Sequence, residues 1–311
     1  MSQTPFPIIS IDPIEVVGEE QLGSKEKFWF RRAGQLWLFK EARVIHADGA
    51  VLPAGEDWAE KIASEVAQLL NIPVATVELA EYQGRRGCAS LNFTTQAKQL
   101  EHGNEVMAGL LDGYDPELRY RQTSHTVDNI VTAVSKMFPS LREHRSALQQ
   151  LASYLVLDAL IGNTDRHHEN WGFLWQVQVD IDEVTEAGRI TKEYEVAPTF
   201  DLGSSLGREL LDAKRLQHLA NKTVENYLRK ARGGIFMPGA KRGASPLALV
   251  ESTAQEYPDY FRPTLDRLRS TPLERIVAIV DRVPGERMTP AARDFAKAML
   301  GVAHECLRRV V

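Results

Sequence analysis

An apolar stretch that leads directly into a string of polar residues constrains this chain more than any other feature. Residues 148–161 carry enough large apolar side chains to predict a central, buried helix, and the string NTDRHHEN follows at 163–170. Side chains at the end of a rigid element are held in a fixed geometry. We therefore expect Asp165 and Asn170 to be presented together beside a packed core.

The spacing of Asp165 and Asn170, with Asp201 further along, is typical of a phosphoryl-transfer site. The carboxylate of Asp165 would act as the base or orienting group for an attacking hydroxyl. The amide oxygen of Asn170 and the carboxylate of Asp201 would bind a metal ion. A helix C-terminal turn and a helix cap are the alternatives for Asp165 and Asp201. Neither explains why three polar residues stand between apolar runs at this spacing.

Lys40 closes the apolar run LWLFK at 36–40. A lysine is poorly placed there unless its amine points into a cleft, where it would bind nucleotide phosphates and pair with a helix glutamate. Glu60 and Glu65 are both candidates for that pairing, and the helical wheel favours Glu65 because it borders the apolar face. A strand-end lysine in solvent is the alternative.

The residues next to Asp165 are less specific indicators of function. Adjacent histidines point in different directions, and no third nitrogen or sulfur ligand lies near His167 and His168, so a zinc site is not indicated. We expect His167 to pack or to form a hydrogen bond that stiffens the loop. Arg166 is assigned to a phosphate or to an acidic group of the later segment, with a surface arginine as the alternative.

Composition excludes several classes of protein. The chain has 311 residues, of which 43% are hydrophobic and 25% charged, and these are the proportions of an ordinary globular protein. A net charge of -5 argues against a chain whose main task is to neutralise nucleic-acid phosphates.

Cys88 and Cys306 are far apart and fit neither a disulfide framework nor a metal site. No secretion signal or membrane span is evident, so we expect a cytoplasmic protein.

The first third of the chain predicts a small, mostly β unit. Gly23-Ser24 stands before a strand and could bring backbone N–H groups to phosphates, although such a pair is usually only a turn. The elements predicted here are a hairpin over 26–40 with its turn at Ala33-Gly34, a helix over 56–70 that ends at Asn71-Ile72-Pro73, and strands over 74–79 and 87–93.

After Thr94 the pattern changes to helices joined by polar loops. Short strands are predicted on either side of an acidic hairpin tip at 182–192, and the Gly-rich loop 233–245 contains the basic group Lys241-Arg242-Gly243. Both loops are exposed candidates for contact with a substrate or a partner, although each is first of all a solvated loop. The predicted elements are helices over 127–138, 148–161, 208–232, 272–281 and 290–310, and strands over 173–179 and 194–196.

The motifs resemble those of the HipA family of serine/threonine kinases, the toxin kinases of bacterial toxin–antitoxin pairs. The string NTDRHHENWGFL at 163–174 and APTFDL at 197–202 carry the resemblance, which extends over about 22–201. A bare Asp-x4-Asn would not be specific, but the longer string is. GSKEK at 23–27 looks like the family's Gly-x-x-x-Lys phosphate loop, and Glu60 fits the spacing of its small-lobe helix.

The resemblance implies an α+β, bilobal protein-kinase-like fold, with a small, mostly β N-lobe over 1–94 and a larger, mostly helical C-lobe over 95–311. It implies an enzyme that uses ATP and Mg2+, with Asp165 as the catalytic residue together with Lys40, and Asn170 and Asp201 as the magnesium ligands. Ser24 becomes a candidate for autophosphorylation. The residues that the resemblance assigns to ATP are Gly23, Ser24, Lys25, Lys40, Glu60 and, in the hinge after Cys88, Leu91, Asn92 and Phe93.

The partners implied by the resemblance are a protein substrate, such as an aminoacyl-tRNA synthetase or another translation factor, and an antitoxin protein. No helix-turn-helix segment is evident, so we expect no direct contact with nucleic acid and none with a membrane. The chain also starts close to its phosphate loop, so we expect the N-terminal subdomain of longer HipA proteins to be absent.

Two questions stay open at the level of sequence: how the chain is arranged between Asn170 and Asp201, and which class of protein carries the site. The gap between Asn170 and Asp201 is longer than the short hairpin usual in kinases, which indicates an inserted hairpin. The same Asp-x4-Asn site also serves small-molecule and lipid kinases. A catalytically silent module that binds a nucleotide or an antitoxin is the alternative from another class.

Overall fold

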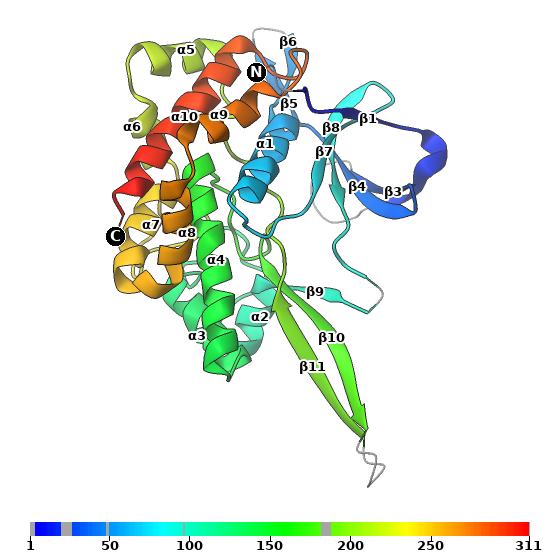
Figure 1. Ribbon diagram of the computed structural model, residues 1–311, viewed down its shortest axis with the longest axis vertical. Coiled ribbons are helices and arrows are strands. Elements are labelled where there is room, and N and C mark those ends of the chain that lie inside the picture. Colours follow the sequence, from blue (N-terminus) through cyan, green and yellow to red (C-terminus); the bar gives the residue numbers. More distant parts are fainter. Residues whose placement is uncertain (1–3, 20–26, 48–49, 96, 182–187, 311) are drawn as a thin grey trace.

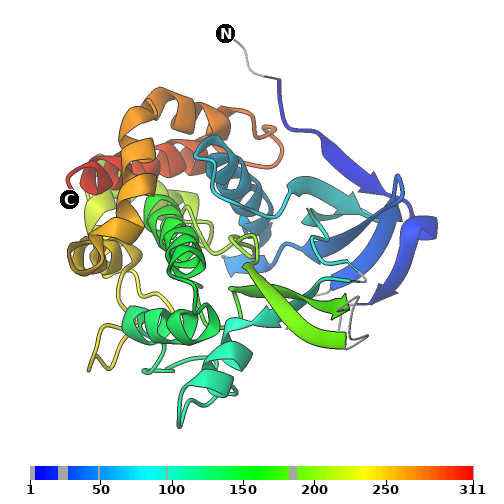
Figure 2. The ribbon, with the colours of Figure 1, turned by 60° about the horizontal axis from the view of Figure 1, so that its bottom comes forward.

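The computed structural model of the protein describes residues 4–19, 27–47, 50–95, 97–181 and 188–310. The chain forms two lobes, one built on a β-sheet and the other on helices (Figure 1). Turned to bring its lower end forward, the molecule has the sheet on one side and most of the helices on the other (Figure 2). Among the described residues, no helix is both long enough and apolar enough to cross a membrane.

The N-terminal lobe contains a six-stranded sheet in the order β1-β7-β8-β4-β3-β2. Alternate side chains of β3 and β4 are large and apolar, and Phe28, Phe30 and Phe39 are buried in a small core on one face of the sheet. The strands are β1 (Ile8–Ile11), β2 (Val16–Glu19), β3 (Lys27–Arg32), β4 (Gln35–Glu41), β7 (Val77–Tyr82) and β8 (Arg85–Leu91), with a 3-10 turn at Pro13–Glu15 and a separate hairpin of β5 (Val44–Ala47) and β6 (Ala50–Pro53).

The predicted hairpin turn at Ala33-Gly34 is confirmed. Both residues have positive φ, 49° and 76°, and Arg32 pairs with Gln35 across the turn. The next two strands lie closer together than predicted, at 77–82 and 85–91, because the chain reverses within two residues at Gln83-Gly84, which also have positive φ. The sequence had suggested a longer loop there.

Helix α1 (Glu56–Leu69) packs its apolar face into the larger core, which also contains Leu79 of β7, and Trp58, Ile62 and Val66 are buried as predicted. It ends where expected, because Asn71 takes a left-handed conformation with φ 50°. This helix carries both Glu60 and Glu65, so its rotation decides which of them faces the sheet.

The C-terminal lobe is helical and is organised around α4 (Leu141–Ile161). That helix starts seven residues earlier than predicted, because its first two turns are polar and exposed and so have no apolar signal. The predicted helix 208–232 is two helices, broken at Lys222, where φ is 53°. The other helices are α2 (Gly103–Leu110), α3 (Val127–Met137), α5 (Asp212–Ala220), α6 (Val224–Lys230), α7 (Pro246–Glu256), α8 (Pro258–Ser270), α9 (Leu273–Asp281) and α10 (Pro290–Arg308), of which α2, α7 and α8 were not predicted.

The segment between Asn170 and Asp201 forms a long hairpin of β10 (Gly172–Ile181) and β11 (Gly188–Val196). The short strand β9 (Gln99–His102) pairs with the other edge of β10. The hairpin extends away from both lobes (Figure 1). Residues 188–192 belong to β11, so the prediction that they form part of the tip is wrong, whereas 182–187 lie outside the described residues. The predicted lobe boundary at residue 94 stays a prediction.

Candidate active site

The loop after α4 is fixed by hydrogen bonds to the helix end. Gly162 ends α4 in a left-handed conformation with φ 67°. Asn163 then donates from its Nδ2 to Asp158 Oδ1 at 2.8 Å and accepts at its Oδ1 from the backbone N–H of Asp165 at 3.1 Å. The side chain of Asn163 therefore sets the position of the Asp165 backbone relative to the buried helix.

Arg166 is buried beneath this loop, so the surface position considered as an alternative is wrong, and its acidic partner is Asp158 of α4 rather than a group of the later segment. Its guanidinium forms a fork on Asp158, with Nε to Oδ2 at 2.7 Å and Nη2 to Oδ1 at 2.8 Å. It also donates to Thr199 Oγ1 at 2.9 Å and to the backbone carbonyl of Asn170. Burial opposes the charge, but the Asp158 carboxylate more than offsets that effect, and the pKa of Arg166 lies above its ordinary value. Arg166 joins three segments of the site.

Asp165 and Asn170 lie on one short loop, as predicted. Asn170 donates from Nδ2 to the backbone carbonyl of Asp165 at 2.7 Å, which turns its side-chain oxygen away from that bond. The side chain of Asp165 is about one-third exposed, at 36%, whereas Asn170 is buried. A reacting group could therefore reach the carboxylate while the loop beneath it stays fixed.

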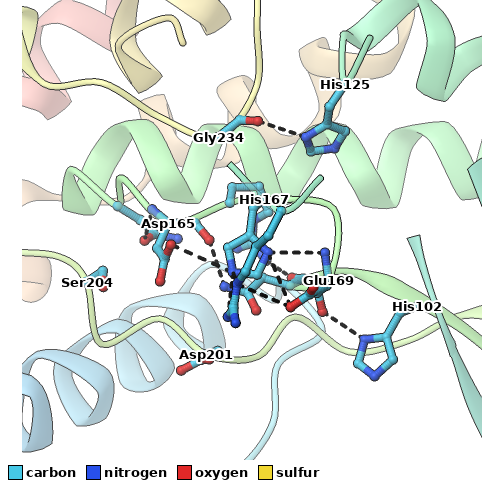
Figure 3. A network of polar contacts seen from close by, with 12 residues as sticks. His102, His125, Asp165, His167, Glu169, Asp201, Ser204 and Gly234 are labelled. Carbon is cyan, nitrogen blue, oxygen red and sulfur yellow. Dashed lines mark hydrogen bonds and ion pairs between the residues drawn. The ribbon is translucent and has the colours of Figure 1, made fainter. Parts of the chain in front are cut away.

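His167 supports the loop as expected. Its Nε2 lies 3.8 Å from Asp165 Oδ1 and 3.1 Å from Nη2 of Arg119 (Figure 3). Burial and the charge of Arg119 lower the pKa of His167 to about 3, so the ring is neutral. The ring of His168 lies at 79° to that of His167 and receives a separate contact from Tyr114 Oη at 2.8 Å. The two histidines thus serve different parts of the lobe.

Lys40 projects from the end of β4 to the centre of the site. Its Nζ lies 3.3 Å from Glu60 Oε1 and 3.0 Å from Asp201 Oδ1, and the side chain is 10% exposed. Burial opposes the charge, but the carboxylates of Asp201 and Glu60 more than offset it, so the pKa of Lys40 lies above its ordinary range. The lysine stays charged and links the sheet, α1 and the segment after the hairpin.

Glu65, the partner favoured by the helical wheel, does not reach Lys40. Its carboxylate pairs instead with Lys61 at 2.8 Å and with Arg282 at 3.0 Å. The wheel described the apolar face correctly, but Lys40 reaches α1 at Glu60, nearer to the N-terminal end of the helix. Only the tertiary structure shows which glutamate lies within reach of the lysine.

Asp201 takes a left-handed backbone conformation, with φ 57°, which is unfavourable for a residue with a side chain. The segment that follows is held against α1: Arg208 pairs with Glu56 at 2.8 Å, and a Cβ added to Gly203 would approach Glu60 Oε2 to 3.2 Å. These contacts stabilise the strained backbone and aim the carboxylate at Lys40.

The donor set fits a magnesium ion. Among the described residues, no three His, Cys, Asp or Glu side chains gather as metal ligands. Magnesium does not need them, because it keeps several waters and is commonly held by one or two protein oxygens together with phosphate oxygens. The side chains of Asn170 and Asp201 offer such oxygens, and Arg166 connects their two segments by donating to the carbonyl of Asn170 and to Thr199 Oγ1.

The predicted adenine-binding residues follow the end of β8. The backbone N–H of Leu91 is bonded to Thr76 at 2.8 Å, and that of Asn92 to Leu36 at 2.9 Å. Phe93 lies beyond these bonds, and its ring is 5.7 Å from that of Phe200, next to Asp201. The predicted phosphate-binding residues Gly23, Ser24 and Lys25 lie outside the described residues.

Sequence reasoning missed the residues that hold the catalytic loop, above all Asp158, Asn163 and Thr199. A signal was present for Asp158, because it stands within the apolar run LVLDALI at 155–161. A carboxylate in such a helix requires a buried partner. The sequence could not identify Arg166 as that partner.

The chain is similar to known proteins in sequence and in fold. A family model described as the HipA-like C-terminal domain matches residues 21–257. The serine/threonine-protein kinase CtkA of Helicobacter pylori is 28% identical over 156 residues, which cover 48% of this chain and 40% of CtkA. The alignment thus covers less than two thirds of that relative.

Solved structures show the same fold. The crystal structure of the proinflammatory kinase CtkA of Helicobacter pylori matches with a TM-score of 0.74 and 19% identity over 97% of each chain. HipA of Shewanella oneidensis MR-1, solved in a complex with HipB and operator DNA, matches with a TM-score of 0.56 and 12% identity over 95% of this chain and 66% of HipA. The bilobal kinase-like fold is confirmed, and this chain belongs to the HipA-like kinase family.

Proposed function

We propose that this chain is an ATP- and magnesium-dependent serine/threonine protein kinase. The observation that carries the proposal is the position of Lys40, whose ammonium lies between Glu60 of α1 and Asp201. A buried lysine held by two carboxylates is suited to bind the phosphates of a nucleotide, because it stays charged and needs little reorganisation. The similarity to the serine/threonine kinase CtkA supports the same class of activity.

In the proposed reaction the acceptor hydroxyl lies next to Asp165. Its oxygen forms a bond to the γ-phosphorus while the bond from that phosphorus to the β-phosphate oxygen breaks, and ADP leaves. The hydroxyl proton passes to the Asp165 carboxylate. His167 and Asn163 position Asp165 through the loop and stay outside the chemistry.

Asn170 and Asp201 would hold magnesium, which supplies positive charge to the phosphate oxygens when it is bound. Lys40 orients the phosphates and Glu60 orients Lys40. We assign the adenine to the chain around Phe93, where its neighbours Leu91 and Asn92 already use their backbone N–H groups within the protein.

The test uses ATP labelled at its γ-phosphate, with magnesium, a mixed protein lysate and a metabolite extract. The proposal expects labelled protein from the parent chain and none from Asp165→Asn, with a matched control in the exposed residue Asp112→Asn. Label on metabolites alone would assign the chain to the small-molecule kinases. Absence of all transfer, with nucleotide binding unchanged in Asp165→Asn, would leave a silent nucleotide-binding module.

The fold shared with HipA also motivates a proposed antitoxin partner, because that HipA was solved together with HipB. We extend the proposal to a protein substrate involved in translation, such as an aminoacyl-tRNA synthetase. Identification of the labelled lysate proteins by mass spectrometry tests this extension directly.

A further inference from the structure

In two loops that pack on the catalytic loop, the charged side chains are all basic. Residues 118–126 and 230–245 contain Lys and Arg but no Asp or Glu, within a chain whose net charge is -5. We define the basic rim as the basic residues of these segments that lie outside helix α6 (Val224–Lys230): Arg119, Arg121, Arg232, Lys241 and Arg242.

Arg119 brings the basic rim to the reacting group. Its Nη2 lies 3.1 Å from Nε2 of His167, and the same ring nitrogen lies 3.8 Å from the carboxylate of Asp165. The guanidinium also pairs with Glu169 at 3.3 Å, yet the side chain is 39% exposed. A positive charge that is open to solvent therefore stands one imidazole ring away from the proposed catalytic carboxylate.

The second loop is seated directly on the catalytic loop. A Cβ added to Gly234 would come within 2.7 Å of the carbonyl oxygen of Arg166 and the nitrogen of His167, so the two backbones are in close contact. The carbonyl of Gly234 accepts from the ring of His125 at 2.8 Å (Figure 3). The backbone of Phe236 donates to the carbonyl of His125 at 2.9 Å. These bonds fix the two basic segments to each other and to the loop that carries Asp165.

The remaining charges of the basic rim are exposed. Arg232 stands two residues from Gly234, and Arg242 adjoins Gly243, whose backbone packs against Gly233. Within the described part of the chain, neither Arg121 nor Lys241 nor Arg242 forms an ion pair, and all three are exposed. Exposed cations that lack partners attract an anionic ligand over roughly 10 Å at moderate ionic strength.

We propose that the basic rim selects acceptor segments in which the serine or threonine is surrounded by acidic residues. This inference rests on the proposed kinase function and specifies its substrate class. An acidic peptide is favoured over nucleic acid, because the chain as a whole is acidic and the rim contains only a few cations beside a carboxylate suited to activate a hydroxyl. Within the chain itself, Glu169 shows how an acidic residue would bind to the rim, because its carboxylate pairs with Arg119.

The experiment compares serine peptides whose flanking residues are acidic, neutral or basic, in the presence of magnesium and labelled ATP. We expect a KM about tenfold lower for the acidic set than for the neutral set at about 20 mM salt, and a difference that shrinks toward about 500 mM. The double variant Lys241→Glu/Arg242→Glu should remove the preference. The control Arg262→Glu/Arg275→Glu reverses two exposed charges on α8 and α9 and should retain it.

The milder variant Arg119→Gln should lose part of the preference, measured as the ratio of KM values for the neutral and acidic peptides. Equal use of the three peptide sets by the parent chain, or a preference for the basic set, would overturn the inference while leaving the kinase function intact. Failure to label any peptide or protein would instead overturn the kinase function. Retention of labelled RNA by the parent but not by the double variant, without any peptide preference, would assign the rim to nucleic acid and also overturn the inference.

Discussion

Arg287, in the loop before the last helix, places its Nη1 3.3 Å from Oδ2 of Asp57 in α1, and both side chains are almost fully buried. The same guanidinium reaches Glu81 of β7 at 3.1 Å. Arg86 of β8 shares Asp57 at 2.9 Å. The C-terminal part of the chain, beyond the region matched by the family model, therefore holds the helix that carries Glu60.

Arg287→Ala should loosen α1. We expect the free energy of unfolding to fall by about 3 kcal/mol, because a buried carboxylate loses one of its two arginines. We also expect the KM for ATP to rise, because Glu60 no longer orients Lys40 reliably. Urea unfolding and initial-rate kinetics measure the two effects. The control Arg282→Ala removes a more exposed contact of the same helix, at Glu65, and should leave the KM for ATP near that of the parent.

Glu60→Gln and Lys40→Met should each reduce phosphoryl transfer by about 10²-fold, because a positioned charge contributes that much to an electrostatic site. Glu65→Gln serves as the matched control, since it changes a glutamate of the same helix that pairs with Lys61. Single-turnover rates with labelled ATP distinguish the two site variants from this control. Equal losses in Glu60→Gln and Glu65→Gln would contradict the assigned roles.

Asp158→Ala should destabilise the protein by about 3–5 kcal/mol, because the buried guanidinium of Arg166 loses its counter-charge. Asp158→Asn keeps an oxygen for Asn163 and Arg166 and should have a smaller effect. Chemical unfolding measures both variants. If Asp158→Ala were as stable as the parent, Arg166 would not depend on this pair.

Stability should fall as the pH drops below about 6.5. His125 is buried and neutral: its Nδ1 contacts the carbonyl of Gly234 at 2.8 Å, and its Nε2 accepts from Trp171 at 3.0 Å. Burial, with the nearby charges of His168 and Arg166, lowers its pKa to about 3.

The pKa of His125 is thus depressed in the folded state, and that of His167 is lowered to about 3 as well. Between about pH 6.5 and 3 the unfolded chain binds more protons, so each histidine contributes a loss of about 1.4 kcal/mol per pH unit as the pH falls. Urea unfolding at several pH values measures the slope. His125→Gln should make it shallower, and an unchanged slope would contradict this prediction.

Much of the fold was readable from local signals. The turn at Ala33-Gly34, the end of α1 at Asn71 and the buried part of α4 follow from turn chemistry and apolar spacing, which act over a few residues. Helices α7 and α8 were missed, because the segment 246–270 contains four-residue apolar spacings interrupted by Pro258 and Pro263. The proline at the start of α8 separates two helices that the packing holds together.

The sequence by itself predicted which groups form the site, because Asp165 and Asn170 stand in one specific string, at 163–170, and Asp201 stands in a second, at 197–202. It did not determine their partners. Glu60 rather than Glu65 meets Lys40, and Arg166 turns inward to Asp158 rather than outward. The physical reason is distance along the chain: motif spacing records which residues share an element, whereas pairing depends on how separate elements cross. Only the packed structure sets those crossings.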